Sequence, residues 1–215
     1  MCSTAKINPA DDKTLVILLP GYKSNNQELL FLKDSMEKKR GTSFVCLPYQ
    51  LIGGNGERPI KQISEELIKQ IRSLLLKHEF NHCYLIGYSL GSALALNIVV
   101  DYPNMFSGLV LISMFDDRKN LLLNRGIILA KENDIKPISL IEKTKRTNLL
   151  FIHGTSDKSI AIERAIKVFK KSNKKYSKFI SIPDDHYFSN DHSKAPINKS
   201  ISEFLKLNTN QSPGS

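Results

Sequence analysis

Residues Leu85–Ala93 read LIGYSLGSA and contain the pattern Gly-x-Ser-x-Gly centred on Ser89. An apolar run, Cys83–Gly87, leads into the pattern, and a second one, Leu90–Asp101, follows with spacing typical of a helix. In this context the pattern predicts a tight turn from strand to helix, with Ser89 at its tip. A side chain at position 87 or 91 would clash in such a turn, so glycine is required at both positions. The alternative is a serine in an ordinary strand-to-helix turn.

Short apolar runs alternate with amphipathic segments along the rest of the chain. We expect six strands: Thr14–Leu19, Ser43–Leu47, Cys83–Gly87, Leu109–Ser113, Asn148–His153 and Lys178–Ile182. Helical spacing marks five segments: Asn26–Lys39, Pro59–His78, Leu90–Asp101, Ile160–Lys171 and Ala195–Leu207. Continuous apolar strands are usually buried on both faces, and β-α-β order is typical of parallel pairing. The sequence therefore predicts an α/β fold, with a mostly parallel sheet of about six strands flanked by helices.

The length of 215 residues predicts a single domain, which we place over residues 1–207. Residues 114–147 interrupt the alternation between the fourth and fifth strands. We interpret this segment as a minimal cap of one or two helices over the sheet. A plain crossover helix with a long loop fits the same pattern. Residues 208–215 are expected to form a disordered tail.

The net charge is +10, from 31 Lys+Arg against 21 Asp+Glu, and most of the excess lies in residues 114–215. Lysine accounts for 24 of the basic residues, whereas proteins that read bases favour arginine. The sequence also lacks zinc-finger spacing and other nucleic-acid-binding motifs. We therefore expect no nucleic-acid partner. The excess predicts a solvated lysine-rich surface, with at most a weak association with anionic lipid surfaces.

Cysteine and hydropathy patterns exclude several other classes of protein. The three cysteines form no Cys-x-x-Cys pair, so neither a disulfide framework nor a zinc site is predicted. Cys46 and Cys83 lie in apolar runs, where cysteine behaves as a small buried hydrophobe. No run approaches the length of a membrane-spanning helix, and Met1–Asp12 lacks the apolar core of a signal peptide. We expect a cytoplasmic protein that uses no metal and no organic cofactor.

A serine hydroxyl is a weak nucleophile unless a histidine, itself oriented by a carboxylate, takes its proton. The fifth predicted strand runs into His153-Gly154-Thr155-Ser156-Asp157, and the sixth into Pro183-Asp184-Asp185-His186. Asp157 and His186 thus follow strand ends, in the chain order Ser, Asp, His that is found on this type of sheet. We predict that Ser89, Asp157 and His186 meet at the carboxyl edge of the sheet.

Other titratable residues were weighed for the same roles. His192 remains the rival base, but it lies six residues further along, in a polar loop. His78 and His82 precede the serine in the chain, and His153 is expected to satisfy a local hydrogen bond at its strand end. Asp184 and Asp185 are interpreted as loop and capping residues.

Two backbone N–H groups are expected to bind the oxyanion that forms when a carbonyl is attacked. The first belongs to Leu90, at the start of the helix after Ser89. The second comes from the loop after the first strand, where Gly21 allows a close approach of the backbone to a substrate. Tyr22 is the expected donor in that loop, and Lys23 is the alternative.

Three segments carry a resemblance to a known family. They are LVILLPGYKSNNQELLFL at residues 15–32, YLIGYSLGSALAL at residues 84–96 and LLFIHGTSDKSI at residues 149–160. They resemble the first strand with its oxyanion loop, the nucleophile turn and the acid-bearing strand of the small phospholipase/carboxylesterase family. That family includes the acyl-protein thioesterases and has the α/β-hydrolase fold. The resemblance spans Thr14–Leu207 and implies Ser89 as nucleophile, His186 as base, Asp157 as acid, and Tyr22 and Leu90 as oxyanion donors.

The chain departs from this family in four places. Pro20-Gly21 stands where His-Gly is common, and Ser92 stands where a second glycine is common. Asp184 and Asp185 precede the histidine in place of small residues. The loop Pro48–Arg58 is shorter than in many thioesterases of the group.

These residues predict a serine hydrolase, a carboxylesterase or thioesterase, that cleaves small-molecule esters or thioesters through an acyl-enzyme. Two alternatives stay open. One is a non-catalytic protein of the same fold that binds a ligand or a protein. The other is an acyltransferase that uses the same three residues.

Overall fold

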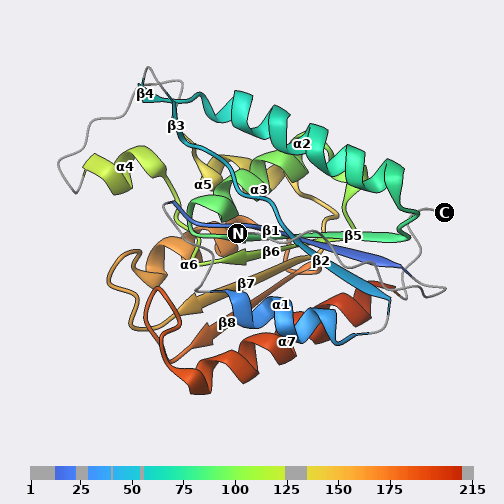
Figure 1. Cartoon of the computed structure of the whole chain (residues 1–215). Helices are drawn as coiled ribbons and strands as arrows, with labels where there is room; N and C mark the ends of the chain where they lie inside the picture. The colour runs from blue at the N-terminus through green and yellow to red at the C-terminus, as the bar shows by residue number, and fades with distance from the viewer. Residues whose placement is uncertain (1–12, 23–28, 40, 54–55, 124–134, 210–215) are drawn as a thin grey trace.

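Six parallel strands form one sheet in the order β2-β1-β5-β6-β7-β8 (Figure 1). The structure is a computed structural model that describes residues 13–22, 29–39, 41–53, 56–123 and 135–209. The strands are β1 (Thr14–Leu19), β2 (Thr42–Cys46), β5 (His82–Tyr88), β6 (Gly108–Ile112), β7 (Leu149–Gly154) and β8 (Ser177–Ile182). Each lies within a residue or two of its predicted range, so the predicted sheet is confirmed. The glycine-rich segment after β2 adds a two-stranded hairpin, β3 (Ile52–Gly53) with β4 (Gly56–Glu57).

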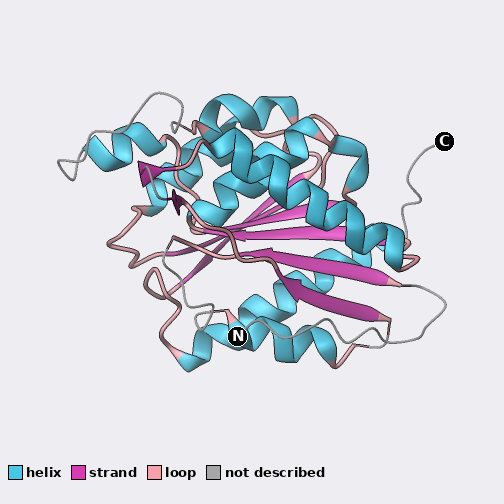
Figure 2. Ribbon diagram, turned by 45° about the horizontal axis from the view of Figure 1, so that its top comes forward, coloured by secondary structure: helices cyan, strands magenta, loops and turns pink. Residues whose placement is uncertain are grey.

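Helices cover both faces of the sheet (Figure 2). Successive side chains of each strand point to opposite faces, so both faces carry apolar side chains that need cover. In β1, Leu15 and Ile17 pack in one cluster with the apolar side of α2 (Ile60–Lys77) and with α3 (Leu90–Asp101). Val16 and Leu18 pack in a second cluster with α1 (Leu30–Glu37) and α7 (Asp191–Thr209). α6 (Ile162–Lys171) contributes to the first cluster through Ala165 and Val168. Burial on both faces explains the continuous apolar strands.

The helix ends differ from the sequence prediction at both ends of the chain. α1 begins at Leu30, and residues 26–28 of the predicted helix lie outside the described residues. α7 begins at Asp191, four residues earlier than predicted, and continues to Thr209, so the first two residues of the predicted tail are helical. The rest of that tail is not described. No helix in the described ranges is long and apolar enough to cross a bilayer.

Residues 114–147 contain α4 (Arg118–Leu123), α5 (Pro137–Leu140) and a 3₁₀ helix, Ile141–Lys143. α4 lies beside the β3-β4 hairpin at the carboxyl edge of the sheet (Figure 1), and Arg118 forms an ion pair with Glu57 of that hairpin. α5 packs against α3 and α6. Residues 124–134 of this segment lie outside the described residues. The reading of the segment as a small cap stays a prediction.

The chain reverses its direction across the sheet between β1 and β5. It leaves β1 through α1 on one face, forms β2 at the edge, and returns to β5 through α2 on the other face. Such a switch point opens a crevice at the carboxyl ends of the two strands, and ligands bind there in open α/β sheets. The predicted nucleophile and the predicted oxyanion loop follow these two strands.

Candidate active site

Ser89 is the single residue between the end of β5 at Tyr88 and the start of α3 at Leu90. Its φ of 53° and ψ of −117° are rare for a residue with a side chain, and such a backbone costs of order 1–3 kcal/mol. A Cβ atom at Gly87 would overlap the Cα of Ser92, and one at Gly91 would overlap the carbonyl oxygen of Leu19. The sharp strand-to-helix turn and its need for both glycines are therefore confirmed.

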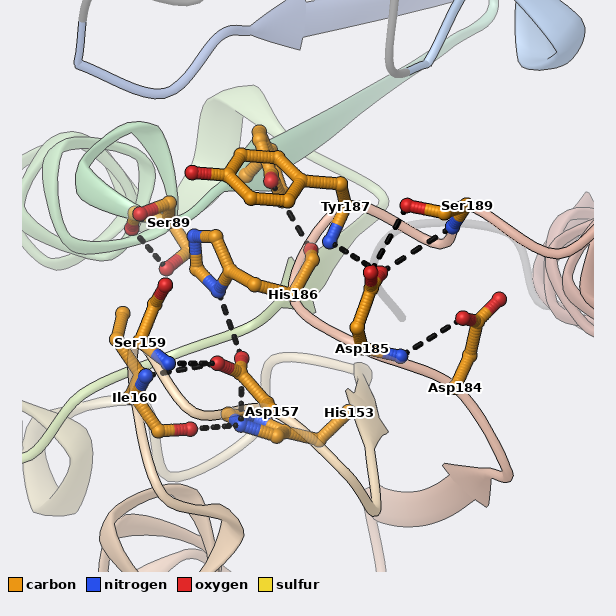
Figure 3. Close-up of polar contacts among 12 residues, drawn as sticks. Ser89, His153, Asp157, Ser159, Ile160, Asp184, Asp185, His186, Tyr187 and Ser189 are labelled. Carbon is orange, nitrogen blue, oxygen red and sulfur yellow. Dashed lines mark hydrogen bonds and ion pairs between the residues drawn. The ribbon is translucent and has the colours of Figure 1, made fainter.

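Asp157 and His186 form a buried hydrogen bond in which His186 Nδ1 lies 2.7 Å from Asp157 Oδ2 (Figure 3). The other carboxylate oxygen accepts the backbone N–H groups of Ser159 at 2.8 Å and of Ile160 at 2.7 Å. Burial alone would raise the pKa of Asp157, but hydrogen bonds from two histidines and a backbone N–H hold this pKa well below its usual range. The carboxylate is therefore ionised near neutral pH, and both of its oxygens accept hydrogen bonds.

The loops that carry these two residues are joined because β7 and β8 are neighbours. The backbone N–H of Thr155 donates to the carbonyl oxygen of Ile182, and that of Ser156 donates to the carbonyl oxygen of Asp184. The loop after β7 therefore pairs with the loop after β8. A Cβ atom at Gly154 would lie 2.5 Å from the carbonyl oxygen of Asp184, so only glycine permits this approach. Backbone pairing thus sets the distance between acid and base.

Tyr88 connects the base to the turn that carries Ser89. Its hydroxyl donates to the carbonyl oxygen of His186 at 3.0 Å, and the two rings have centroids 5.3 Å apart. Figure 3 shows the imidazole of His186 between the Asp157 carboxylate and Ser89. This role was not predicted, because nothing in the sequence marks a tyrosine before the serine as a partner of a distant histidine.

The other titratable residues near the site take the structural roles that the sequence predicted. Asp184 accepts the backbone N–H groups of Asp185 and Asn190, and Asp185 accepts those of Tyr187 and Ser189. His192, the rival base, is exposed in the first turn of α7. Among the described residues, the histidines that face Asp157 are His186 and His153.

His153 satisfies a local hydrogen bond, as the sequence predicted. Its Nε2 lies 2.8 Å from the carbonyl oxygen of Ile160. The same nitrogen lies 3.3 Å from Asp157 Oδ2, a contact that the sequence analysis did not foresee. The only hint was the spacing of four residues between His153 and Asp157.

The predicted oxyanion donors belong to two segments, the start of α3 and the loop after β1. Leu90 begins α3 and is buried, whereas Tyr22 follows β1 and is 46% exposed. A Cβ atom at Gly21 would lie 3.3 Å from the Cβ of Ser89, so the segment after β1 passes directly beside the serine. Lys23, the alternative donor, lies outside the described residues.

A hydrogen bond from the segment after β2 holds the segment after β1 in place. The hydroxyl of Tyr49 donates to the carbonyl oxygen of Pro20 at 2.9 Å, and burial raises the pKa of this phenol despite the opposing charge of Arg118. Arg118 in turn pairs with Glu57, and Asp116 pairs with Arg164 of α6 at 2.5 Å. These contacts join elements that lie far apart in the chain, so no local sequence pattern predicts them.

A cavity of about 350 Å³ opens beside Gly21, and therefore beside Ser89. It is lined by Gly21, Tyr22, Tyr49, Gln50, Leu51 and Ile52. Its lining mixes polar groups with apolar side chains, and Ile52 is 54% exposed at its margin. The volume lies at the lower end of the range for small-molecule sites.

The described residues hold no group of three or more His, Cys, Asp or Glu side chains that could bind a metal ion. Burial raises the pKa of the Cys83 thiol to about 12, which leaves it protonated and unreactive. Ser89 is partly accessible and lies directly before the first residue of α3.

Comparisons with known proteins agree with this architecture. No model of a known protein family matches the chain. One curated relative is the RutD protein of Pantoea ananatis, described as a carbamate hydrolase, which is 30% identical over 83 residues. That match covers 34% of this chain and 30% of the relative, so less than a third of the relative's length is represented.

Several solved structures superpose over nearly the whole chain. Est1E from Butyrivibrio proteoclasticus has a TM-score of 0.76 and 14% identity, over 96% of this chain and 93% of its own. An esterase of Pyrococcus furiosus has a TM-score of 0.75 and 16% identity, over 92% and 84%. The enol-lactonase of Burkholderia xenovorans has a TM-score of 0.70 and 10% identity, over 94% and 96%. The narrower resemblance to acyl-protein thioesterases stays a prediction, whereas the sheet, the turn at Ser89 and these likenesses together establish that this chain has the α/β-hydrolase fold.

Proposed function

We propose that this chain is a serine hydrolase that cleaves carboxylic esters or thioesters, with Ser89 as nucleophile, His186 as base and Asp157 as acid. The observation that carries the proposal is the 2.7 Å bond from His186 to Asp157 beside the strained turn at Ser89. The esterases and the lactonase among the structural neighbours support the same chemical class.

The bond to Asp157 sets the tautomer of His186. Because Nδ1–H donates a hydrogen bond to the carboxylate, Nε2 keeps a free lone pair and can accept the proton of the Ser89 hydroxyl. The serine oxygen then forms a bond to the substrate carbonyl carbon, and the carbonyl oxygen becomes an oxyanion. The N–H groups of Leu90 and Tyr22 are the donors proposed to stabilise this charge.

Collapse of the tetrahedral intermediate breaks the bond to the leaving alcohol or thiol, which takes the proton from His186 Nε2. A water molecule then gives a proton to the same nitrogen and attacks the acyl-enzyme carbonyl. Return of this proton to Ser89 releases the carboxylic acid and restores the free enzyme. Every proton transfer passes through one nitrogen, so the orientation of the His186 ring controls both halves of the cycle.

The cavity beside Gly21 favours acyl groups of short or medium length. Its volume of about 350 Å³ and its partly polar lining suit a small acyl group better than a long alkyl chain. One solved structure of Est1E, a neighbour with 14% identity, holds ferulic acid, so a feruloyl ester belongs among the test substrates. Activity that rises steadily to sixteen-carbon esters would contradict the expected preference.

Labelling with a fluorophosphonate probe tests the proposal directly. We expect the wild type to be labelled and to hydrolyse short-chain esters, and Ser89→Ala to lose both activities. Ser113→Ala is the matched control, because Ser113 also has a positive φ, of 51°, and follows the next strand, but it is fully buried. Hydrolysis that persists in Ser89→Ala, or a folded wild type that is not labelled, would contradict the proposal. The second result would favour a non-catalytic binding protein.

A further inference from the structure

The histidine on the other side of Asp157 has no step of its own in the proposed mechanism. His153 is the fifth residue of β7, and its side chain is fully buried, like that of Asp157. Its Nε2 lies 2.8 Å from the carbonyl oxygen of Ile160 and 3.3 Å from Asp157 Oδ2. Both neighbours are acceptors, so the ring carries its proton on Nε2 and donates towards them.

The second ring nitrogen supports this assignment. His153 Nδ1 is buried and, among the described residues, has no hydrogen-bond partner. In the Nε2–H tautomer, Nδ1 carries a lone pair and no proton. A proton on Nδ1 would make it a buried donor without an acceptor. The ring therefore donates in one direction, towards the loop that holds Asp157.

The loop from Asp157 to Ile160 is closed at both of its ends. Asp157 Oδ1 accepts the N–H groups of Ser159 and Ile160, which fold the loop around the carboxylate. The carbonyl oxygen of Ile160 accepts a hydrogen bond from His153 Nε2, which ties the far end of the loop back to β7. With this tie in place, the one remaining oxygen, Oδ2, points to His186 at 2.7 Å (Figure 3).

We propose that His153 is a positioning residue that keeps the Asp157 carboxylate aligned with His186. It acts through its bond to the Ile160 carbonyl and its contact with Asp157. Its effect on catalysis rests on the proposed function, but its effect on the bond between Asp157 and His186 does not. Without the Nε2 donor, the loop gains freedom, and Oδ2 leaves the direction that orients the imidazole.

Two substitutions separate the donor from the volume of the ring. His153→Leu fills much of the space without a donor, and His153→Gln places an amide N–H near the position of Nε2. His82→Leu is the control, since His82 is also a buried histidine but lies at the first residue of β5, at the opposite edge of the sheet. Thermal unfolding of each variant checks that it is folded.

The first measurement is the proton resonance of His186 Nδ1–H, which a short bond to a carboxylate moves far downfield and which needs no substrate. We expect the resonance in the wild type, in His82→Leu and in His153→Gln, and its upfield shift or loss in His153→Leu. The second measurement is ester hydrolysis. We expect kcat of His153→Leu to fall by about 10- to 100-fold with a KM within about twofold of the wild type, and His153→Gln to recover most of the loss.

An unchanged resonance and an unchanged kcat in His153→Leu would overturn the proposal. So would equal losses of kcat in the Gln and Leu variants, because the ring would then matter only for packing. If His153→Leu does not fold, the comparison moves to His153→Asn, whose shorter side chain ends near Nδ1, and kcat equal to that of Gln would overturn the proposal. Absence of the resonance in the wild type would overturn it too. A wild type that shows the resonance but cleaves no ester would contradict the proposed function alone.

Discussion

The two sides of the candidate site are held by different kinds of contact. On the acid–base side, the loops after β7 and β8 are bound to each other by backbone hydrogen bonds, and the Asp157 side chain is fully buried. On the substrate side, the segments after β1 and β2 expose Tyr22 and Ile52 to solvent. In the proposed mechanism, the first side orients the groups that transfer protons, which demands a fixed geometry. In the same mechanism, the second side contacts the variable part of the substrate.

Loss of the acid is expected to have the largest effect and to break the acid–base side. Asp157→Asn keeps the shape of the side chain but favours the wrong tautomer of His186, so we expect kcat to fall by about 10⁴-fold. Steady-state ester hydrolysis measures it. Asp101→Asn, at the far end of α3, is the control and should retain full activity. A loss of less than tenfold in Asp157→Asn would mean that another group orients the base.

The same variant should also change how the fold responds to acid. Because the pKa of Asp157 is lowered in the folded state, its carboxylate stabilises the protein above its unfolded-state pKa, near 4. That contribution disappears as the pH falls towards the lower folded-state pKa. The difference in free energy of unfolding between wild type and Asp157→Asn should therefore shrink between pH 7 and pH 3. Denaturant unfolding at both values measures it, and a constant difference would contradict the assignment.

A milder change sharpens the role of the link between base and nucleophile. Tyr88→Phe removes the hydroxyl that bonds to the carbonyl of His186 but keeps the ring, at a cost of about 1 kcal/mol in stability. We expect kcat to fall by up to about fivefold, because the loop that carries His186 loosens. Tyr84→Phe is a matched control: Tyr84 is buried on the same face of β5, and its hydroxyl bonds to Leu205. It should lose similar stability and no kcat, and equal losses of kcat would refute the link.

The smallest effect is expected on the substrate side. Ile52→Ala should leave the free energy of unfolding within about 0.5 kcal/mol of the wild type, since the side chain is 54% exposed. KM should rise by about twofold for esters that reach this side chain, with kcat unchanged. Leu76→Ala is the control, because Leu76 is 89% exposed on α2 and lies outside the cavity lining. A KM unaffected across a chain-length series would remove Ile52 from the substrate contacts.

Local patterns in the sequence were enough to place the six strands of the sheet, most of the helices and the three proposed catalytic residues. The strands were predictable because burial on both faces demands continuous apolar runs, and β1 matches its predicted range without a shift. The turn at Ser89 was predictable because its two glycines mark it in the sequence. Both are required, since a Cβ atom at either would overlap neighbouring backbone atoms. Asp157 and His186 were predictable because both follow strand ends, and strand ends of a parallel sheet share one edge.

The contacts that hold those residues could not be predicted in this way. Tyr88 to His186, Tyr49 to Pro20 and Arg118 to Glu57 each join segments that lie 29 to 98 residues apart. The helical start of α7 before Pro196 was also missed, because a proline inside a helix removes a backbone hydrogen bond and usually marks a helix start, whereas α7 runs through it. The hairpin of β3 and β4 was missed because two-residue strands leave no periodicity to detect.

The order of chemical groups along the chain belongs to the sequence: an oxyanion loop after the first strand, a serine at a glycine-flanked turn, then an acid and a histidine after later strands. The sequence favoured His186 over His192 as the neighbour of Asp157, whereas the placing of His153 against the same carboxylate came only from the folded chain. The physical reason is range. Periodicity and turn chemistry act over a few residues, whereas hydrogen bonds form wherever packing brings a donor within about 3 Å of an acceptor.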